Sequence, residues 1–275
     1  MTWVRGGDLK IATEKNRNQQ QENPTMIFRQ LFEPESSTYT YLLGDRATNE
    51  AVLIDPAVET AESDLSLIND LGLKLVYTLE THVHADHLTG ARKLKHLAGS
   101  MIAGPAMDGL PCTDVGVEEG TPLRVGAIVL HPLFTPGHTS THHSYLLEQG
   151  DTPRVFTGDA LLIDGCGRTD FQSGDAVSLY RAIHEKLFTL PADTLVYPGH
   201  DYLNRHVSTI SQERERNERL GGGKTLEEFV AIMDGLDLSY PKKIDFAVPG
   251  NERCGECPPN VPEEMRSLCD VTRQG

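Results

Sequence analysis

The stretch Thr81-His82-Val83-His84-Ala85-Asp86-His87 places four potential metal ligands within six residues. It follows residues 73–79, an apolar run with the length of a buried strand. Three imidazoles and one carboxylate packed so tightly would repel one another if charged and would lose hydration if buried. A transition metal that accepts their lone pairs removes both penalties. Because alternate residues of a turn can point at one centre, the spacing predicts a metal site at a strand end, and a solvated polar loop is the weaker interpretation.

The composition of the 275 residues is that of an ordinary globular protein, with 38% hydrophobic and 24% charged residues. A net charge of −15 argues against nucleic acid or a membrane surface as a partner, and an anionic small substrate would need a local basic group. Five cysteines in a chain of this length do not suggest a secreted disulfide scaffold. Neither a membrane-spanning apolar run nor a signal-peptide core is evident. We therefore expect a protein of the bacterial cytoplasm or the mitochondrial matrix that is not secreted.

The chain divides into three segments. Residues 1–25 are polar and nearly free of apolar anchors, so we expect a mobile N-terminal extension. Residues 26–253 predict one catalytic domain, and residues 254–275 predict a C-terminal tail. Strands are expected at residues 26–32, 38–43, 51–54, 73–79, 123–125, 127–130, 145–147, 154–156 and 194–197, and helices at residues 61–71, 91–97, 176–188, 207–220 and 225–235. Two similar halves indicate two sheets between helix layers, and the Pro-rich residues 236–275 are expected to wrap the surface.

Four apolar runs each lead to a residue that can bind a metal; these residues are His82, His138, Asp159 and His200. A glycine directly precedes the last three, and it lets the backbone turn tightly and approach a site without a Cβ atom in the way. Strand ends are where a rigid sheet aims short loops at one crevice. The agreement of four such endings predicts that these side chains share one site.

The chain resembles the metallo-β-lactamase superfamily in the order and spacing of His82-Val83-His84-Ala85-Asp86-His87, Gly137-His138, Gly158-Asp159 and Gly199-His200. The resemblance implies an α/β (α+β) fold, the αββα sandwich of two mixed sheets between helix layers. Within the superfamily the chain is similar to the persulfide dioxygenases, also called sulfur dioxygenases. This narrower resemblance is carried by Arg168-Thr169-Asp170-Phe171-Gln172 and by residues 134–139, 156–167, 197–202 and 241–245.

The similarity to persulfide dioxygenases implies an enzyme that oxidises glutathione persulfide with O2 and water to sulfite and glutathione, a reaction of sulfide detoxification. It also implies one Fe(II) per chain, held by His82, His138 and Asp159. Two imidazoles and one carboxylate on one face of an octahedron leave up to three positions open for oxygen and a persulfide sulfur. Zinc has no redox chemistry and could not serve this reaction.

Four further residues leave the number of metals open; they are His84, Asp86, His87 and His200. A dinuclear hydrolase such as glyoxalase II, which hydrolyses S-D-lactoylglutathione, would use them for a second metal. A persulfide dioxygenase would keep them as hydrogen-bonding groups around bound water and the iron ligands. Glyoxalase II is also similar at Gly165-Cys166-Gly167-Arg168 but departs from the chain at residues 169–172, so it is the second hypothesis. A non-catalytic binding module is the third, because no candidate ligand is missing.

Three residues are candidates for contact with the substrate. Arg168 carries a planar guanidinium that matches a glutathione carboxylate, and a structural salt bridge to Asp164 or Asp170 is the competing interpretation. Tyr202, close to His200, is expected either to hydrogen-bond near the iron or to belong to the core. Cys166 is a candidate redox-sensitive thiol near the metal, although its flanking glycines favour a packing role.

The remaining cysteines and histidines are expected to have structural roles. Cys254 and Cys257 have a zinc-type or redox-type spacing, but without a second ligand pair they predict an incidental surface pair. The basic residues in the run 214–219 alternate with acidic ones and predict a solvated helix face. Solvated helix positions are expected for His96, His184 and His206, and positions in the scaffold or around the ligands for His131, His142 and His143. A homodimer is compatible with the sequence.

Overall fold

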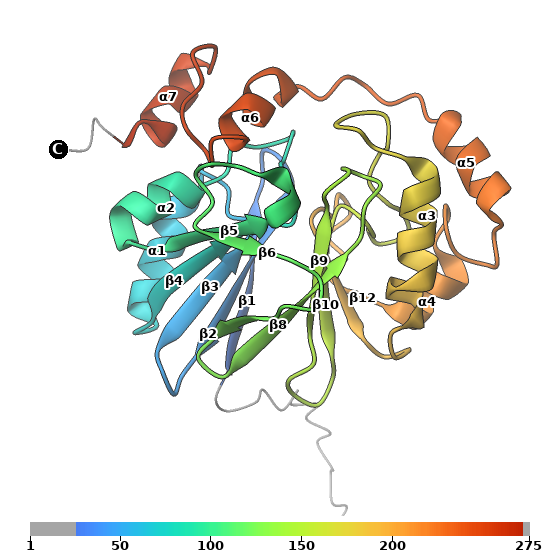
Figure 1. The fold of residues 1–275 in the computed structure, drawn as a ribbon, viewed down its shortest axis with the longest axis horizontal. Helices are drawn as coiled ribbons and strands as arrows, with labels where there is room; N and C mark the ends of the chain where they lie inside the picture. Colours follow the sequence, from blue (N-terminus) through green and yellow to red (C-terminus); the bar gives the residue numbers. More distant parts are fainter. Residues whose placement is uncertain (1–25, 272–275) are drawn as a thin grey trace, which may run out of the picture.

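The computed structural model describes residues 26–271, which form two six-stranded sheets packed face to face between layers of helices (Figure 1). The strands of the first sheet follow chain order: β1 (Met26–Glu33), β2 (Thr38–Asp45), β3 (Glu50–Ile54), β4 (Lys74–Leu79), β5 (Met101–Pro105) and β6 (Val115–Val117). The first three strands are antiparallel, and β3 to β6 are parallel. Parallel neighbours bring their carboxyl ends to one edge, so the loop after β4 opens at that edge.

The second sheet has the order β12-β11-β10-β9-β8-β7. Its strands are β7 (Leu123–Val125), β8 (Ile128–Phe134), β9 (His143–Leu147), β10 (Arg154–Gly158), β11 (Leu195–Pro198) and β12 (Ser208–Thr209). Only β10 and β11 pair in parallel. Both sheets are therefore mixed, as expected from the sequence.

The helices form two outer layers. Figure 1 shows α1 (Ala61–Asp70) and α2 (Ala91–Ala98) beside the first sheet and α3 (Ala176–Glu185), α4 (Ile210–Arg216) and α5 (Leu226–Asp234) beside the second. Two helices at the end of the described chain, α6 (Ile244–Asn251) and α7 (Glu263–Cys269), return to the side of the first sheet. Short 3-10 turns lie at Ala106–Asp108 and Leu187–Thr189.

Alternating side chains explain the layers. On β2 all eight residues are buried, and Tyr39, Tyr41 and Leu43 face the second sheet, whereas Leu42 faces α1 and α2. The core between the sheets is aromatic, with Phe156 5.0 Å from Tyr41 between ring centroids. The predicted αββα sandwich is confirmed, and the burial of both faces of the central strands is what requires helices outside each sheet.

The predicted helix over residues 207–220 is too long. Ser208 and Thr209 pair with β11, and the Thr209 side chain accepts a hydrogen bond from the Gln212 amide, so the helix begins at Ile210. It ends at Arg216 because Asn217 leaves helical geometry and its side chain donates to the carbonyl of Gly165. By contrast, α5 begins at a capping box of Thr225 and Glu228, close to the predicted start.

The C-terminal part of the chain contains more regular structure than the sequence indicated. Neither α6 nor α7 was predicted, because Pro249 lies inside α6 and α7 has only seven residues. Strands β5 and β6 were also missed, since β5 ends in Gly104-Pro105 and β6 has only three residues. Helices α6 and α7 pack in one apolar cluster with Val58 and Leu88.

The cysteine prediction was wrong. Cys254 and Cys257 are not an incidental surface pair: Cys254 forms a disulfide with Cys112, and Cys257 forms one with Cys269. Spacing along the chain could not reveal this, because the partner of Cys254 lies 142 residues away. The mobile extension expected at residues 1–25 lies outside the described residues. Within the described part of the chain, no helix has the length and apolar character needed to cross a membrane.

Candidate metal centre

Loops at the ends of four strands meet at one edge of the sandwich and are joined by backbone hydrogen bonds. The loop after β4 carries His82, the β8–β9 loop carries His138, and Asp159 and His200 follow β10 and β11. The Gly199 amide donates to the Gly158 carbonyl at 2.8 Å, and the His143 amide donates to the Thr81 carbonyl at 2.9 Å. The four endings therefore form one site, as the sequence predicted.

Two glycines permit this close approach. Gly158 has φ of 47°, a left-handed conformation that side chains other than glycine rarely adopt. A Cβ atom on Gly199 would lie only 2.6 Å from Oδ1 of Asp159. The glycines before Asp159 and His200 thus allow the carboxylate to face the loop after β11.

The first group of candidate ligands comprises His82, His138 and Asp159, whose ligand atoms all lie within 4.8 Å of one another. Nε2 of His138 is 3.6 Å from Oδ2 of Asp159. Nε2 of His82 and Oδ1 of Asp159 are buried without a hydrogen-bond partner among the described residues. Buried polar atoms are rarely left unpaired, so this arrangement fits a bound cation.

The Nδ1 atom of each candidate ligand histidine in this group is occupied by a hydrogen-bond partner, which fixes the ring. Nδ1 of His138 is 2.8 Å from the Arg168 carbonyl and donates to it, which leaves Nε2 to face the centre. Nδ1 of His82 faces Oγ1 of Thr81, which itself donates to Asp55. Both rings therefore present Nε2 to the centre. Burial, followed by repulsion from His84 and His138, holds the pKa of His82 well below its usual value, so the ring is neutral.

His142 positions the carboxylate ligand. Its Nε2 accepts a hydrogen bond from the Asp159 amide at 3.2 Å, and its Nδ1 faces the Thr135 hydroxyl at 2.9 Å. Burial and the neighbouring His138 lower its pKa well below the usual value, and only a neutral ring can accept this bond. His142 therefore contacts the candidate ligand Asp159, which is one of the two positions expected for it.

A second group lies beside the first. Ligand atoms of His84, Asp86 and His87 lie within 4.8 Å of one another, and Nδ1 of His84 and Nε2 of His87 are buried without a partner among the described residues. Nε2 of His200 is 3.5 Å from Asp86 and 3.6 Å from Asp159, while Nδ1 of His200 faces the Ser37 carbonyl. All four residues expected around the centre are therefore present at it.

His84 differs from His82 in its electrostatic surroundings. Its Nε2 is 3.1 Å from Asp55 and 3.4 Å from Glu80. Burial disfavours a charged ring, but Asp55 and Glu80 outweigh it and hold the pKa of His84 well above its usual value. The same three residues also form a compact group of potential ligand atoms.

A pocket of about 400 Å³ opens onto Asp86, His138, Asp159 and His200. A volume of this size is typical of a small-molecule site. The other lining residues are Ala85, Leu162, Cys166, Gly167, Arg168, Tyr202, Arg219, Leu238, Ser239 and Pro241.

The three candidate substrate residues all line this pocket. Arg168 forms two hydrogen bonds of 2.6 Å with Asp170, so a salt bridge does hold its guanidinium. Tyr202 is 69% exposed and its ring stacks parallel to His200, which excludes a core position. Cys166 is 2% exposed, and burial raises the pKa of its thiol to about 11, so it is protonated at neutral pH.

Arg219 was missed by the sequence interpretation, which placed the whole run 214–219 on a solvated helix face. It lies beyond the end of α4, donates to the Cys166 carbonyl at 2.7 Å and lines the pocket. Glu213, on α4, is fully buried and accepts a hydrogen bond from the side-chain amide of Asn217. His206 is exposed as expected but lies in a loop and not on a helix. The sequence carried no signal for these positions, because the helix end that directs Arg219 inward depends on contacts with residues 162–166.

The fold and the ligand geometry agree with comparisons to known proteins. The sequence pattern of the metallo-beta-lactamase superfamily matches residues 34–200, and the chain belongs to this superfamily. The crystal structure of ETHE1 from Myxococcus xanthus superposes with a TM-score of 0.80 at 51% identity, covering 84% of this chain and 100% of that one. Persulfide dioxygenase ETHE1 of Bos taurus is 48% identical over 257 residues, 93% of this chain and 99% of the relative. Within the superfamily, the chain thus belongs to the persulfide dioxygenase family.

The glyoxalase-type relatives are more distant. Hydroxyacylglutathione hydrolase of Pseudomonas entomophila is 34% identical over 171 residues, which is 61% of this chain and 63% of the relative. The ranking of the two families inferred from residues 168–172 is confirmed.

Proposed function

We propose that this chain is an iron-dependent dioxygenase that oxidises glutathione persulfide with O2 and water to sulfite and glutathione. The observation that carries the proposal is the pair of buried, unpartnered atoms, Nε2 of His82 and Oδ1 of Asp159, beside His138 at the end of a small-molecule pocket. The family of the chain supports the choice of substrate, since the Bos taurus and Myxococcus xanthus relatives are named as persulfide dioxygenase ETHE1 and ETHE1.

One ferrous ion is the metal that this donor set favours. His82, His138 and Asp159 supply two imidazoles and one carboxylate, the ligand type of non-haem Fe(II) oxygenases. When bound, the iron would supply a redox-active centre with open coordination positions for O2 and a persulfide sulfur. Thr81, the Arg168 carbonyl and His142 orient the three ligands through the hydrogen bonds described above.

The pocket supplies the means to hold an anionic substrate in a chain whose net charge is −15. We assign the glutathione carboxylates to Arg168 and Arg219, the two pocket-lining arginines. Because Asp170 occupies two N–H groups of Arg168, Arg219 is the better candidate for direct contact, and Arg168 contributes mainly charge. Tyr202 is an exposed residue that lines the pocket, and we assign its hydroxyl a hydrogen bond to the substrate.

The protein is proposed to act in the bacterial cytoplasm or the mitochondrial matrix, and the mammalian relatives are named mitochondrial. Glutathione, both the carrier of the substrate and a product, is abundant in such compartments.

A dinuclear hydrolase of S-D-lactoylglutathione is the second candidate. The observation in its favour is the intact group of His84, Asp86 and His87, which has two unpartnered ring nitrogens and room for a second metal. The distant similarity to hydroxyacylglutathione hydrolases points the same way.

Turnover of both substrates decides between the candidates. Anaerobically purified protein is supplied with glutathione persulfide while oxygen uptake and sulfite are measured, and separately with S-D-lactoylglutathione. We expect one sulfite per O2 consumed and no thioester hydrolysis, with oxygen uptake lost in His138→Ala. Thioester hydrolysis without oxygen uptake would establish the second candidate instead.

A further inference from the structure

Helix α6 holds the loop after β4, which carries His82 and is called the metal-binding loop below, through a single side chain. Nδ2 of Asn251, the last residue of α6, donates to the carbonyls of His84 at 2.9 Å and His87 at 2.8 Å. Its Oδ1 accepts from the Thr89 amide at 2.9 Å. Asn251 is only 4% exposed, and the loop after β4 thus depends on it for three backbone hydrogen bonds that water does not supply.

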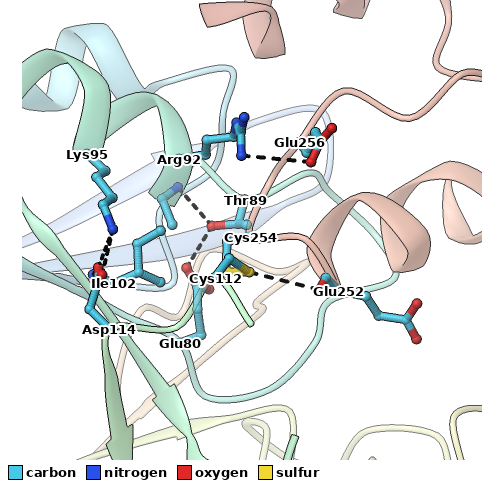
Figure 2. Close-up of a disulfide and its surroundings, with 11 residues drawn as sticks. Glu80, Thr89, Arg92, Lys95, Ile102, Cys112, Asp114, Glu252, Cys254 and Glu256 are labelled. Atoms are coloured by element: carbon cyan, nitrogen blue, oxygen red, sulfur yellow. Dashed lines mark hydrogen bonds and ion pairs between the residues drawn. A yellow bond between two sulfur atoms is a disulfide. The ribbon is translucent and has the colours of Figure 1, made fainter. Parts of the chain in front are cut away.

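A disulfide ties the C-terminal end of α6 to the loop before β6. Cys254 lies three residues beyond Asn251 and its amide donates to the Asn251 carbonyl at 2.8 Å. Its sulfur is bonded to Cys112, and its carbonyl accepts from the Arg92 amide at 3.0 Å. Figure 2 shows the two sulfurs close to Thr89 and Glu80, next to the N-terminal end of α2. The disulfide therefore fixes the segment that carries Asn251 directly beside the metal-binding loop.

The two sulfurs of this bridge differ in access. Cys112 is partly exposed in the loop before β6, whereas Cys254 is 4% exposed within a small apolar cluster with Ala91 and Ile102. A thiolate from solution can therefore reach Cys112, with Cys254 as the leaving group. In compartments kept reducing by glutathione, disulfides that form are usually transient and redox-sensing.

We propose that the Cys112–Cys254 disulfide is a thiol-responsive latch that keeps Asn251 on the metal-binding loop. A glutathione thiolate attacks the sulfur of Cys112, forming a mixed disulfide there and breaking the bond to Cys254. The electron pair leaves with the Cys254 sulfur, which takes up a proton. A second glutathione thiolate then releases Cys112 as a thiolate and forms glutathione disulfide. The choice of glutathione rests on the proposed function, which releases it as a product.

Opening the latch is expected to loosen the loop without unfolding the protein. The apolar cluster of Val58, Leu88, Phe246 and Met265 still attaches α6 and α7 to the first sheet. The hydrogen bonds from Asn251 to the carbonyls of His84 and His87 are the contacts expected to break, and these bonds fix the backbone that carries the two imidazole rings. Disturbing groups that orient metal ligands typically changes metal affinity by about 10-fold or more, so we expect metal release to accelerate by about this factor.

The chain contains a matched control for this idea. The second disulfide, Cys257–Cys269, joins two residues of the C-terminal segment to each other and does not reach the body of the protein. Cys112→Ser removes the latch, and Cys257→Ser removes a disulfide of the same segment without freeing Asn251. Asn251→Ala removes the contact itself while the disulfide remains.

The experiment measures two quantities in each protein, before and after incubation with reduced glutathione. One is the rate at which the metal bound to the purified protein passes to a coloured chelator. The other is the rate of deuterium exchange at the backbone amides of residues 82–90. Mass spectrometry checks that an adduct of one glutathione forms at Cys112 as an intermediate and is replaced by the free thiols of Cys112 and Cys254. In the wild type and in Cys257→Ser, we expect glutathione to speed both metal transfer and deuterium exchange. In Cys112→Ser and Asn251→Ala, we expect both rates to be fast with and without glutathione.

The latch is refuted if Cys112→Ser releases metal and exchanges amides at the rate of the oxidised wild type, or if Cys257→Ser reproduces its effects. Should Asn251→Ala fail to fold, the oxidised and reduced wild type still give the comparison. Neither measurement uses a persulfide, so failure of the proposed function and failure of the latch are separate outcomes.

Discussion

Replacing Gly199 with alanine tests how closely the loop after β11 must approach Asp159, a proposed metal ligand. The new Cβ atom would lie 2.6 Å from Oδ1 of Asp159, whereas ordinary contacts begin near 3.4 Å. The carboxylate must therefore move by about 0.8 Å, more than the tolerance of about 0.5 Å for a functional group in a preorganised site. Gly199 is not in the left-handed region, so the substitution adds this contact without backbone strain of that kind.

The displaced ligand is expected to weaken iron binding by about 10- to 100-fold, which corresponds to about 1.4–2.8 kcal/mol. The assay is anaerobic competition for Fe(II) against a coloured chelator, with circular dichroism to confirm that the variant is folded. Gly165→Ala is the matched control, because no atom lies within 4 Å of a Cβ at that position. A folded Gly199→Ala protein that binds iron within a factor of three of wild type would refute the role given to Asp159.

Three further predictions concern single side chains. Asp64 is buried, and burial is the main cause that raises its pKa from 3.8 to about 6, so the folded state binds the proton more tightly and loses stability as pH rises from about 4 to 6. In urea unfolding, the free energy of unfolding of Asp64→Asn should exceed that of the wild type by up to about 3 kcal/mol at pH 7 and equal it near pH 4. A difference in this free energy that does not depend on pH would contradict the prediction. The Cys166 thiol, with its raised pKa and 2% exposure, should resist iodoacetamide at pH 8 until the protein is unfolded, and rapid labelling of native protein would disprove its burial. Tyr202→Phe should keep its metal but raise KM for glutathione persulfide by about 2- to 10-fold, because the loss of one hydrogen bond to the substrate weakens binding by about that factor. Loss of metal from this variant would contradict the prediction and would mean that the stacking of Tyr202 on His200 supports the centre.

The residues of the candidate metal centre could be predicted because each stands at a strand end beside a glycine or within a dense histidine motif. His82, His138 and Asp159 were found in this way, and the structure brings their ligand atoms together. The layers followed from the alternation of apolar residues on strands such as β2, which is buried on both faces.

What could not be predicted depends on contacts between distant segments. The disulfide partner of Cys254 and the hydrogen bond from the Asp159 amide to His142 each join residues that are far apart in sequence. The inward direction of Arg219 depends on where α4 ends, and contacts with other loops set that end. Helix α6 was missed because its internal Pro249 usually argues against a helix, yet its buried face packs against Leu88 and its last residue binds the metal loop. Local pattern therefore identified the candidate ligands, and tertiary packing determines how they are held.

The most direct test of the account is anomalous X-ray scattering at the iron absorption edge from crystals of anaerobically purified protein. We expect one iron peak per chain, within coordination distance of Nε2 of His82, Nε2 of His138 and the Asp159 carboxylate. Two metal peaks, the second held by Asp86 and His87, or a peak remote from His82, would contradict it.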